Sequence, residues 1–217
     1  MSETQRYATH QPDGDHGAGP GGAAVRRAVM ASALDVVAED GLNALNMREV
    51  ARRSGVPNSA PIRLFRDRDG LVAAVAEEGF LMLFATIDGA VATVPADDPA
   101  KRIAATAIAW ATFAQDHAAQ YRVMAASAPL ARTKSASLMR ASLLVFGRLV
   151  RFIEQGQEVG RIRQWPAQEQ AVVIWSALHG MAMLVIDGQL DAIGIQTSDS
   201  QSLGTLIADR ILQGLAT

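Results

Sequence analysis

Residues 46–68 constrain the fold of this chain more than any other stretch. Asn46 is a suitable N-cap, because its side-chain oxygen can accept a hydrogen bond from a free amide of a helix's first turn. Gly55 can end that helix, since glycine adopts a positive φ without steric cost. These signals predict two short helices joined by a tight turn, which is a helix-turn-helix.

The second helix of this pair is expected to begin near Asn58 or Ser59, either of which can cap it. Pro61 is tolerated because it falls in the first turn, where a missing N–H does no harm. Ile62 and Phe65 are predicted to supply the buried side of this helix.

Positive charge is concentrated in the same stretch, where six arginines stand against two acids between Arg48 and Arg68. A helix-turn-helix places its second helix in the major groove of DNA while the first crosses the backbone. Arginines that neutralise phosphates supply much of the affinity. An ordinary helical hairpin with a solvated basic face shows the same spacing, so the pattern alone leaves both interpretations open.

Helical periodicity continues through the rest of the chain, and no alternating β pattern appears. Residues 1–22 are rich in glycine, proline and polar side chains and cannot bury enough apolar surface to fold. We therefore expect an all-α protein with a disordered tail over 1–22, a three-helix domain over 23–70 and a helical domain over 71–217. A long helix from about 67 to 92 should join the two domains. The other helices are predicted at 24–40, 101–117, 118–126, 131–157, 167–186 and 201–214.

The composition limits the classes of function. The chain has no cysteine, which excludes disulfides and thiolate chemistry and favours a cytoplasmic protein. His117 and His179 are the only histidines outside the tail, and no cluster of metal-ligand residues occurs. No nucleophile or phosphate-loop motif appears in a suitable context. We therefore predict no catalytic residue, no metal and no cofactor.

Three segments, 33–42, 47–56 and 62–71, match one long family motif in the right order, so that residues 25–71 resemble the N-terminal domain of a TetR/AcrR-type transcriptional regulator. Three positions depart from the family. Ile62 stands where the family usually has tyrosine, Leu64 where it often has histidine, and Pro57 where a serine commonly caps the second helix. The resemblance implies DNA binding with fewer phosphate contacts than usual.

A sixteen-residue run without charge, 171–186, dominates the C-terminal part of the chain. A membrane-spanning helix needs about 20 apolar residues, so this shorter run is interpreted as a helix buried on several sides. Part of it should pack against a second subunit. Within the run, Trp175, His179 and Gly180 resemble the Trp-His-Gly signature of one TetR C-terminal subclass.

The resemblance also implies the site residues. Asn46 and Arg68 are expected to hold phosphates, and Ile62 to pack on a thymine methyl or to be a lost contact. The residues expected to point toward base edges are Arg48, Asn58, Ser59 and Arg63. The family binds an apolar effector in its C-terminal half, where this chain has many aromatic and methionine side chains. Those expected to face a cavity are Trp110, Phe113, Phe146, Trp175 and His179.

The function that follows is a homodimeric transcriptional repressor that a small apolar effector releases from a palindromic double-stranded DNA operator, with no membrane partner. A second hypothesis is a dimeric helical ligand-binding protein with weakened or lost DNA binding. An enzyme on a helical bundle is the third. DNA retention that falls steeply with salt would distinguish the first from the second.

Overall fold

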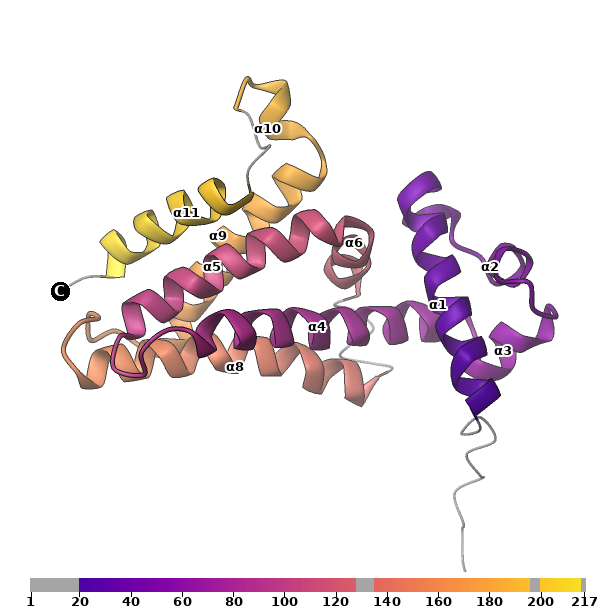
Figure 1. Ribbon diagram of the computed structural model, residues 1–217, viewed down its shortest axis with the longest axis horizontal. Coiled ribbons are helices and arrows are strands. Elements are labelled where there is room, and N and C mark those ends of the chain that lie inside the picture. Colours follow the sequence, from indigo (N-terminus) through magenta and orange to yellow (C-terminus); the bar gives the residue numbers. More distant parts are fainter. Residues whose placement is uncertain (1–19, 128–134, 196–199, 216–217) are drawn as a thin grey trace, which may run out of the picture.

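The computed structural model describes residues 20–127, 135–195 and 200–215, which are helical apart from turns and short connections, with no β-strand among them. A small N-terminal domain lies at one end, and α4 runs from it into a larger helical bundle (Figure 1). The all-α architecture predicted from the sequence, with two helical domains joined by one long helix, is confirmed.

The N-terminal domain has the predicted helix-turn-helix. The Asn46 side chain accepts from the Glu49 N–H at 2.9 Å, and Gly55 has a φ of 68°. Both predicted signals are thus confirmed. The elements of this domain are α1 (Pro20–Asp40), the 3₁₀ helix η1 (Leu42–Ala44), α2 (Met47–Ser54) and α3 (Ser59–Phe65).

The first helix is longer than the sequence suggested. It begins at Pro20, so residues 20–22 belong to α1 rather than to the predicted tail. Residues 1–19 of that tail lie outside the described part of the chain.

The buried face of α3 differs from the prediction. Phe65 is buried as expected, but Ile62 is 54% exposed and Pro61 takes the inward place. Pro61 and Phe65 are four residues apart and therefore lie on one face of the helix, whereas Ile62 is rotated by about 100° from Pro61. The prediction that Ile62 packs in the core is wrong.

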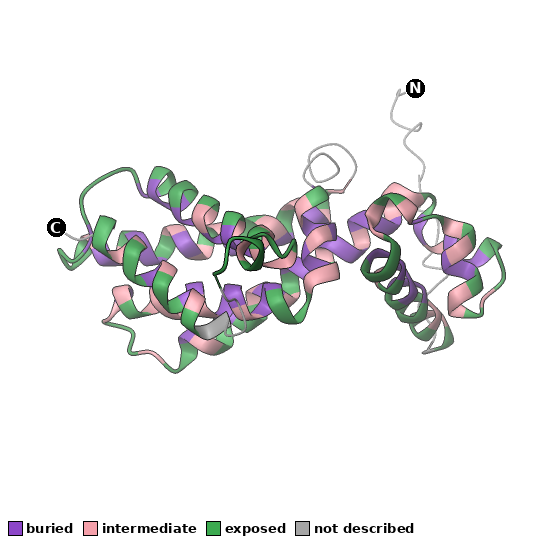
Figure 2. Ribbon diagram, turned by 90° about the horizontal axis from the view of Figure 1, so that it is seen from above, coloured by how far each residue is buried: buried purple, intermediate pink, exposed green. Residues whose placement is uncertain are grey.

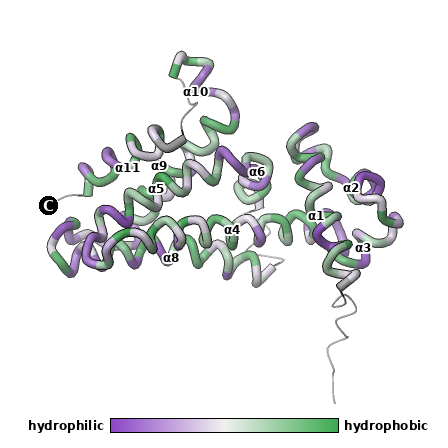
Figure 3. The backbone as a smooth tube through the Cα atoms, viewed as in Figure 1, coloured by the Kyte–Doolittle hydropathy of each residue, from purple (hydrophilic) through white to green (hydrophobic). Residues whose placement is uncertain are grey.

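The N-cap residue fixes the start of the connecting helix α4 (Arg68–Ala92). Asp67 is the N-cap, and its side chain accepts from the Gly70 N–H at 2.8 Å. The helix is mostly hydrophobic, in contrast to the hydrophilic α2 (Figure 3). Its buried side chains belong to a hydrophobic core that includes residues of both domains.

The C-terminal domain packs the remaining helices around α4. Their inner sides are buried and their outer sides exposed (Figure 2). The predicted bounds of α6 and α9 agree with the structure. Residues 131–134 of another predicted helix lie outside the described residues, and the short α10 was not predicted. The helices are α5 (Pro99–Asp116), α6 (Ala118–Ala126), α8 (Ala136–Glu158), α9 (Ala167–Ile186), α10 (Gln189–Ala192) and α11 (Ser200–Leu215).

Two helices, α4 and α9, are long and apolar enough to cross a membrane by length and composition alone. Half of the most apolar window of α4 is buried inside the structure, as in the core helix of a soluble protein, but only a third of that of α9 is. The α9 helix therefore leaves apolar surface that something else must cover.

Candidate functional site

The exposed face of the helix-turn-helix gathers most of the side chains predicted to contact DNA. Asn58, Ser59 and Arg63 are exposed on α3 or at its start, and Arg48 is exposed on α2. Asn46, Arg48 and Asn58 border one hollow, which α1, η1 and α2 also line. The Asn58 side chain makes no capping hydrogen bond, so its amide stays available at the surface.

The arginines of this domain divide into two groups. Arg52 bonds Glu49 at 2.6 Å, and Arg53 bonds both Glu49 at 2.8 Å and Glu39 at 2.6 Å, which ties α2 to α1. Hydrogen bonds from Arg52 and Arg53 lower the pKa of Glu49 to about 2. The positive charges of Arg52 and Arg53 are therefore neutralised within the domain. Within the helix-turn-helix itself, the exposed arginines without such a partner among the described residues are Arg48, Arg63 and Arg66.

The two expected phosphate contacts, Arg68 and Asn46, form hydrogen bonds within the protein. Arg68 donates from Nε to the Leu45 carbonyl at 2.9 Å and from Nη2 to the Leu42 carbonyl at 2.8 Å. The Asn46 amide nitrogen donates to the Ala44 carbonyl at 3.1 Å while its oxygen caps α2. Arg68 thus joins the start of α4 to the connection between α1 and α2, a role that local sequence cannot reveal.

Arg68→Ala should lower the free energy of unfolding by about 2 kcal/mol, because the carbonyls of Leu42 and Leu45 lose a charged donor. Urea denaturation followed by circular dichroism measures this change. Arg63→Ala is the matched control and should leave stability nearly unchanged, since Arg63 is exposed. If Arg68→Ala leaves stability unchanged but weakens DNA binding, Arg68 contacts phosphate and does not stabilise the fold.

The second candidate site is a cavity of about 470 Å³ in the C-terminal bundle, lined by side chains of α4, α5, α6, α8 and α9 and by the residue that ends α6. It is open to solvent between α8 and α9, where Leu143 and Val172 are exposed. Aromatic, aliphatic and methionine side chains form most of its wall, and none of its described lining residues is Asp, Glu, Lys or Arg. The lining residues are Phe80, Trp110, Tyr121, Met124, Ala125, Ser127, Met139, Ser142, Leu143, Phe146, Val172, Trp175, Ser176 and His179.

Four of the five residues predicted to face a cavity do line it: Trp110, Phe146, Trp175 and His179. The fifth, Phe113, does not. It is buried in the core and lies against the His117 ring, with the ring centroids 4.9 Å apart.

Other lining residues were not predicted. Phe80 belongs to α4, which the sequence presented as a connecting rod, and the serines carry no local signal of a cavity. Tyr121 and Met124 on α6 could have been found, because they share the aromatic and methionine character of the predicted set.

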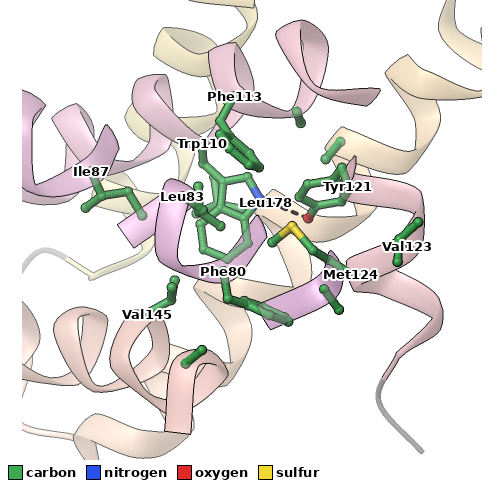
Figure 4. Packing of buried hydrophobic residues seen from close by; sticks show 14 of the residues in the cluster. Phe80, Leu83, Ile87, Trp110, Phe113, Tyr121, Val123, Met124, Val145 and Leu178 are labelled. Atoms are coloured by element: carbon green, nitrogen blue, oxygen red, sulfur yellow. Dashed lines mark hydrogen bonds between the residues drawn. The ribbon is translucent and has the colours of Figure 1, made fainter. Parts of the chain in front are cut away.

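A chain of hydrogen bonds orders one wall of the cavity. Trp110 Nε1–H donates to the Tyr121 hydroxyl at 2.9 Å, and that hydroxyl lies 3.0 Å from His179 Nδ1. Figure 4 shows the first of these bonds among the buried side chains. Burial raises the pKa of Tyr121, although the bond from Trp110 opposes that shift, and burial lowers the pKa of His179. Both groups are thereby held in their neutral forms near pH 7.

Aromatic packing supports the same wall. The Trp110 and Trp175 rings meet edge to face with centroids 5.1 Å apart, and the Phe146 centroid lies 5.9 Å from that of Trp175. Such pairs fix ring positions beyond what burial alone does. In the part of the chain that the structure describes, no group of three or more metal-ligating side chains occurs. The cavity is therefore suited to binding an apolar molecule.

An N-terminal helix-turn-helix domain carried on a helical bundle with an apolar cavity defines a DNA-binding transcriptional regulator. The family model described as "Bacterial regulatory proteins, tetR family" matches residues 29–75, and that described as "Tetracyclin repressor-like, C-terminal domain" matches residues 103–209. The chain belongs to the TetR family. Its narrower assignment to the Trp-His-Gly subclass stays a prediction.

Solved structures agree with this assignment. A protein of unknown function from Rhodococcus sp. RHA1 is 29% identical, with a TM-score of 0.74 over 98% of this chain and 100% of that one. A regulatory protein of the tetR family from Rhodococcus RHA1 is 20% identical, with a TM-score of 0.72 over 88% and 97%. RolR in complex with resorcinol is 19% identical, with a TM-score of 0.61 over 89% and 88%. No curated protein matches the chain.

Proposed function

We propose that this protein is a homodimeric repressor that binds a palindromic DNA operator and leaves it when a small apolar effector fills the C-terminal cavity. The observation that carries the proposal is the position of α6. Its residues Tyr121 and Met124 line the cavity, while Arg122 and Ala126 border a hollow against Val37 and other residues of α1. A molecule in the cavity therefore acts on the helix that touches the DNA-binding domain.

The cavity itself supports an apolar effector. An unpaired ligand charge would be costly there, because the described part of the wall has no Asp, Glu, Lys or Arg. The solved complex of RolR with resorcinol supports a small aromatic ligand in a protein of this fold. An effector that prefers the DNA-free form must weaken DNA binding by the same coupling factor.

The exposed face of the helix-turn-helix supports the DNA half of the proposal. Arg48, Asn58, Ser59 and Arg63 would reach base edges, and the exposed Ile62 would pack on a thymine methyl. Because the operator is chromosomal DNA, we place the protein in the cytoplasm, and the proposed role requires neither a cofactor nor catalysis.

The proposed dimer would form through α9 and α11. Val173 on α9 and Leu206 on α11 are 66% and 52% exposed. Two such helices from each subunit would make a four-helix interface that buries more than about 1,000 Å². A dimer would also carry two α3 helices, which matches an operator with two half-sites.

Selection of bound sequences from a random DNA pool tests the proposal. The expected result is a palindrome with half-sites about one helical turn apart, bound with an affinity that falls steeply as salt rises. A thermal-shift screen of apolar compounds tests effector binding, and each compound that binds is then tested for release of the selected DNA. A chain that enriches no sequence and binds DNA without salt dependence would instead be the dimeric ligand-binding protein.

Arg63→Ala should weaken operator binding by about 1–3 kcal/mol and relax specificity at one base pair in each half-site, because a bidentate contact to a base edge is lost. Binding to a set of singly substituted operators measures both effects. Arg151→Ala on α8 is the control, since it removes an equally exposed positive charge outside the helix-turn-helix. Equal losses in the two variants would mean that Arg63 contributes only general charge.

A further inference from the structure

The hydrogen-bond chain in the cavity wall determines which nitrogen of His179 carries a proton. An indole N–H only donates, so the Tyr121 oxygen accepts from Trp110. The Tyr121 proton then needs an acceptor, and His179 Nδ1 lies 3.0 Å away. A neutral imidazole has one donor and one acceptor. If Nδ1 accepts, the proton of His179 resides on Nε2.

The serine side chains of the cavity have already used their protons. Ser127, Ser142 and Ser176 line the cavity, and each hydroxyl donates to a carbonyl of the preceding turn, at 2.7, 2.9 and 2.8 Å. Their oxygens retain lone pairs, which accept but do not donate. Among the described lining side chains, His179 Nε2–H and the indole N–H of Trp175 are therefore the donors that remain free for a ligand, and His179 is the one that the hydrogen-bond chain orients.

We propose that the effector is a neutral ring compound, mostly apolar, with one oxygen that accepts a hydrogen bond from His179 Nε2–H. This inference rests on the proposed function, in which the cavity is the effector site. Among the described lining residues, a carboxylate would find no lysine or arginine to pair with it, and an ammonium would find no acid. A ketone, ester or hydroxyl oxygen satisfies the free imidazole donor, while aromatic walls cover the rest.

Three probes of similar shape test the ligand class by calorimetric titration of the full chain. Benzophenone has a carbonyl oxygen, diphenylmethane replaces it with a methylene, and 4-benzoylbenzoate adds a carboxylate. We expect benzophenone to bind about threefold to tenfold more tightly than diphenylmethane, which is the usual contribution of one neutral hydrogen bond. The carboxylate probe should bind at least about tenfold more weakly than benzophenone.

Substitutions assign the preference to one atom. His179→Phe should remove the preference for the ketone, and His179→Gln, which retains an N–H donor, should keep part of it. Ser176→Ala is the control and should keep the whole preference, because the Ser176 proton already bonds Val172. Equal binding of ketone and hydrocarbon in the wild type, or a preference that survives in His179→Phe, would overturn the inference.

The tautomer provides a test that does not depend on any variant. Nitrogen-15 spectra of the wild-type histidines should show His179 neutral and protonated at Nε2, whereas protonation at Nδ1 would overturn the assignment. Tighter binding of 4-benzoylbenzoate would do the same, since it would require a protonated His179 and a reversed bond to Tyr121. Failure of all three probes to bind would overturn the ligand class.

DNA binding by the same samples separates this inference from the proposed function. Probes that discriminate through His179 while the chain binds no operator would support the inference and contradict the repressor. Operator release by an effector whose binding does not depend on His179 would support the repressor and contradict the inference.

Discussion

Val173→Asp should convert the proposed dimer to a monomer and lower affinity for a palindromic operator by about two orders of magnitude or more, because two linked half-site contacts become one. Val173 is 66% exposed on α9, within the uncharged run 171–186. In the dimer this side chain would be buried, and an unpaired aspartate there would carry a large desolvation penalty.

Sedimentation velocity and titration of full-site and half-site DNA measure the two effects separately. Half-site affinity should change little, since Val173 belongs to a different domain from the helix-turn-helix. Leu81→Asp on α4 is the matched control, with a side chain 45% exposed and placed away from α9 and α11. Sedimentation of the wild-type protein as a monomer at micromolar concentration would contradict the proposed dimer.

Gly70→Ala is the second large effect, and it concerns the joint between α3 and α4. A Cβ on Gly70 would lie 2.0 Å from the Phe65 carbonyl oxygen and 3.1 Å from its carbon. Both are backbone atoms, so the only relief is a shift of α3 relative to α4. We expect the free energy of unfolding to fall by about 3 kcal/mol, the upper range for overpacking, with loss of operator binding as α3 moves.

Gly89→Ala in the same helix is the control, because nothing lies within 4 Å of a Cβ at Gly89. That variant should gain about 0.5–1 kcal/mol, as alanine does over glycine inside a helix. Thermal unfolding compares the two variants. Equal melting temperatures would show that α3 and α4 adjust to each other freely, which would contradict a rigid joint at Phe65.

Local chemistry made several elements predictable from the sequence. Asn46 caps α2 and Gly55 ends it, as the sequence indicates, and α4 begins at Arg68, close to its expected start. Such caps act within one turn of helix, so no knowledge of distant residues is needed. The bounds of α6 and α9 were likewise set by neighbouring turn and proline signals.

The faces of helices were less predictable. Ile62 was expected in the core of the N-terminal domain but is exposed, and Phe113 was expected at a cavity but lies beyond it. A periodic pattern states which residues share a side of a helix. It does not state which side the next helix covers, particularly for a helix as short as α3.

By itself, the sequence determined the all-α class, the helix-turn-helix, its excess of arginine and the aromatic character of the C-terminal half, because these depend on residue type and short spacing. The tertiary structure alone decided which arginines are free, since Arg53 meets Glu39 and Arg68 meets Leu42 across distances of 14 and 26 residues. It also decided the bond between Tyr121 and His179, 58 residues apart, because only the packing of both α6 and α9 against α5 brings the two side chains together.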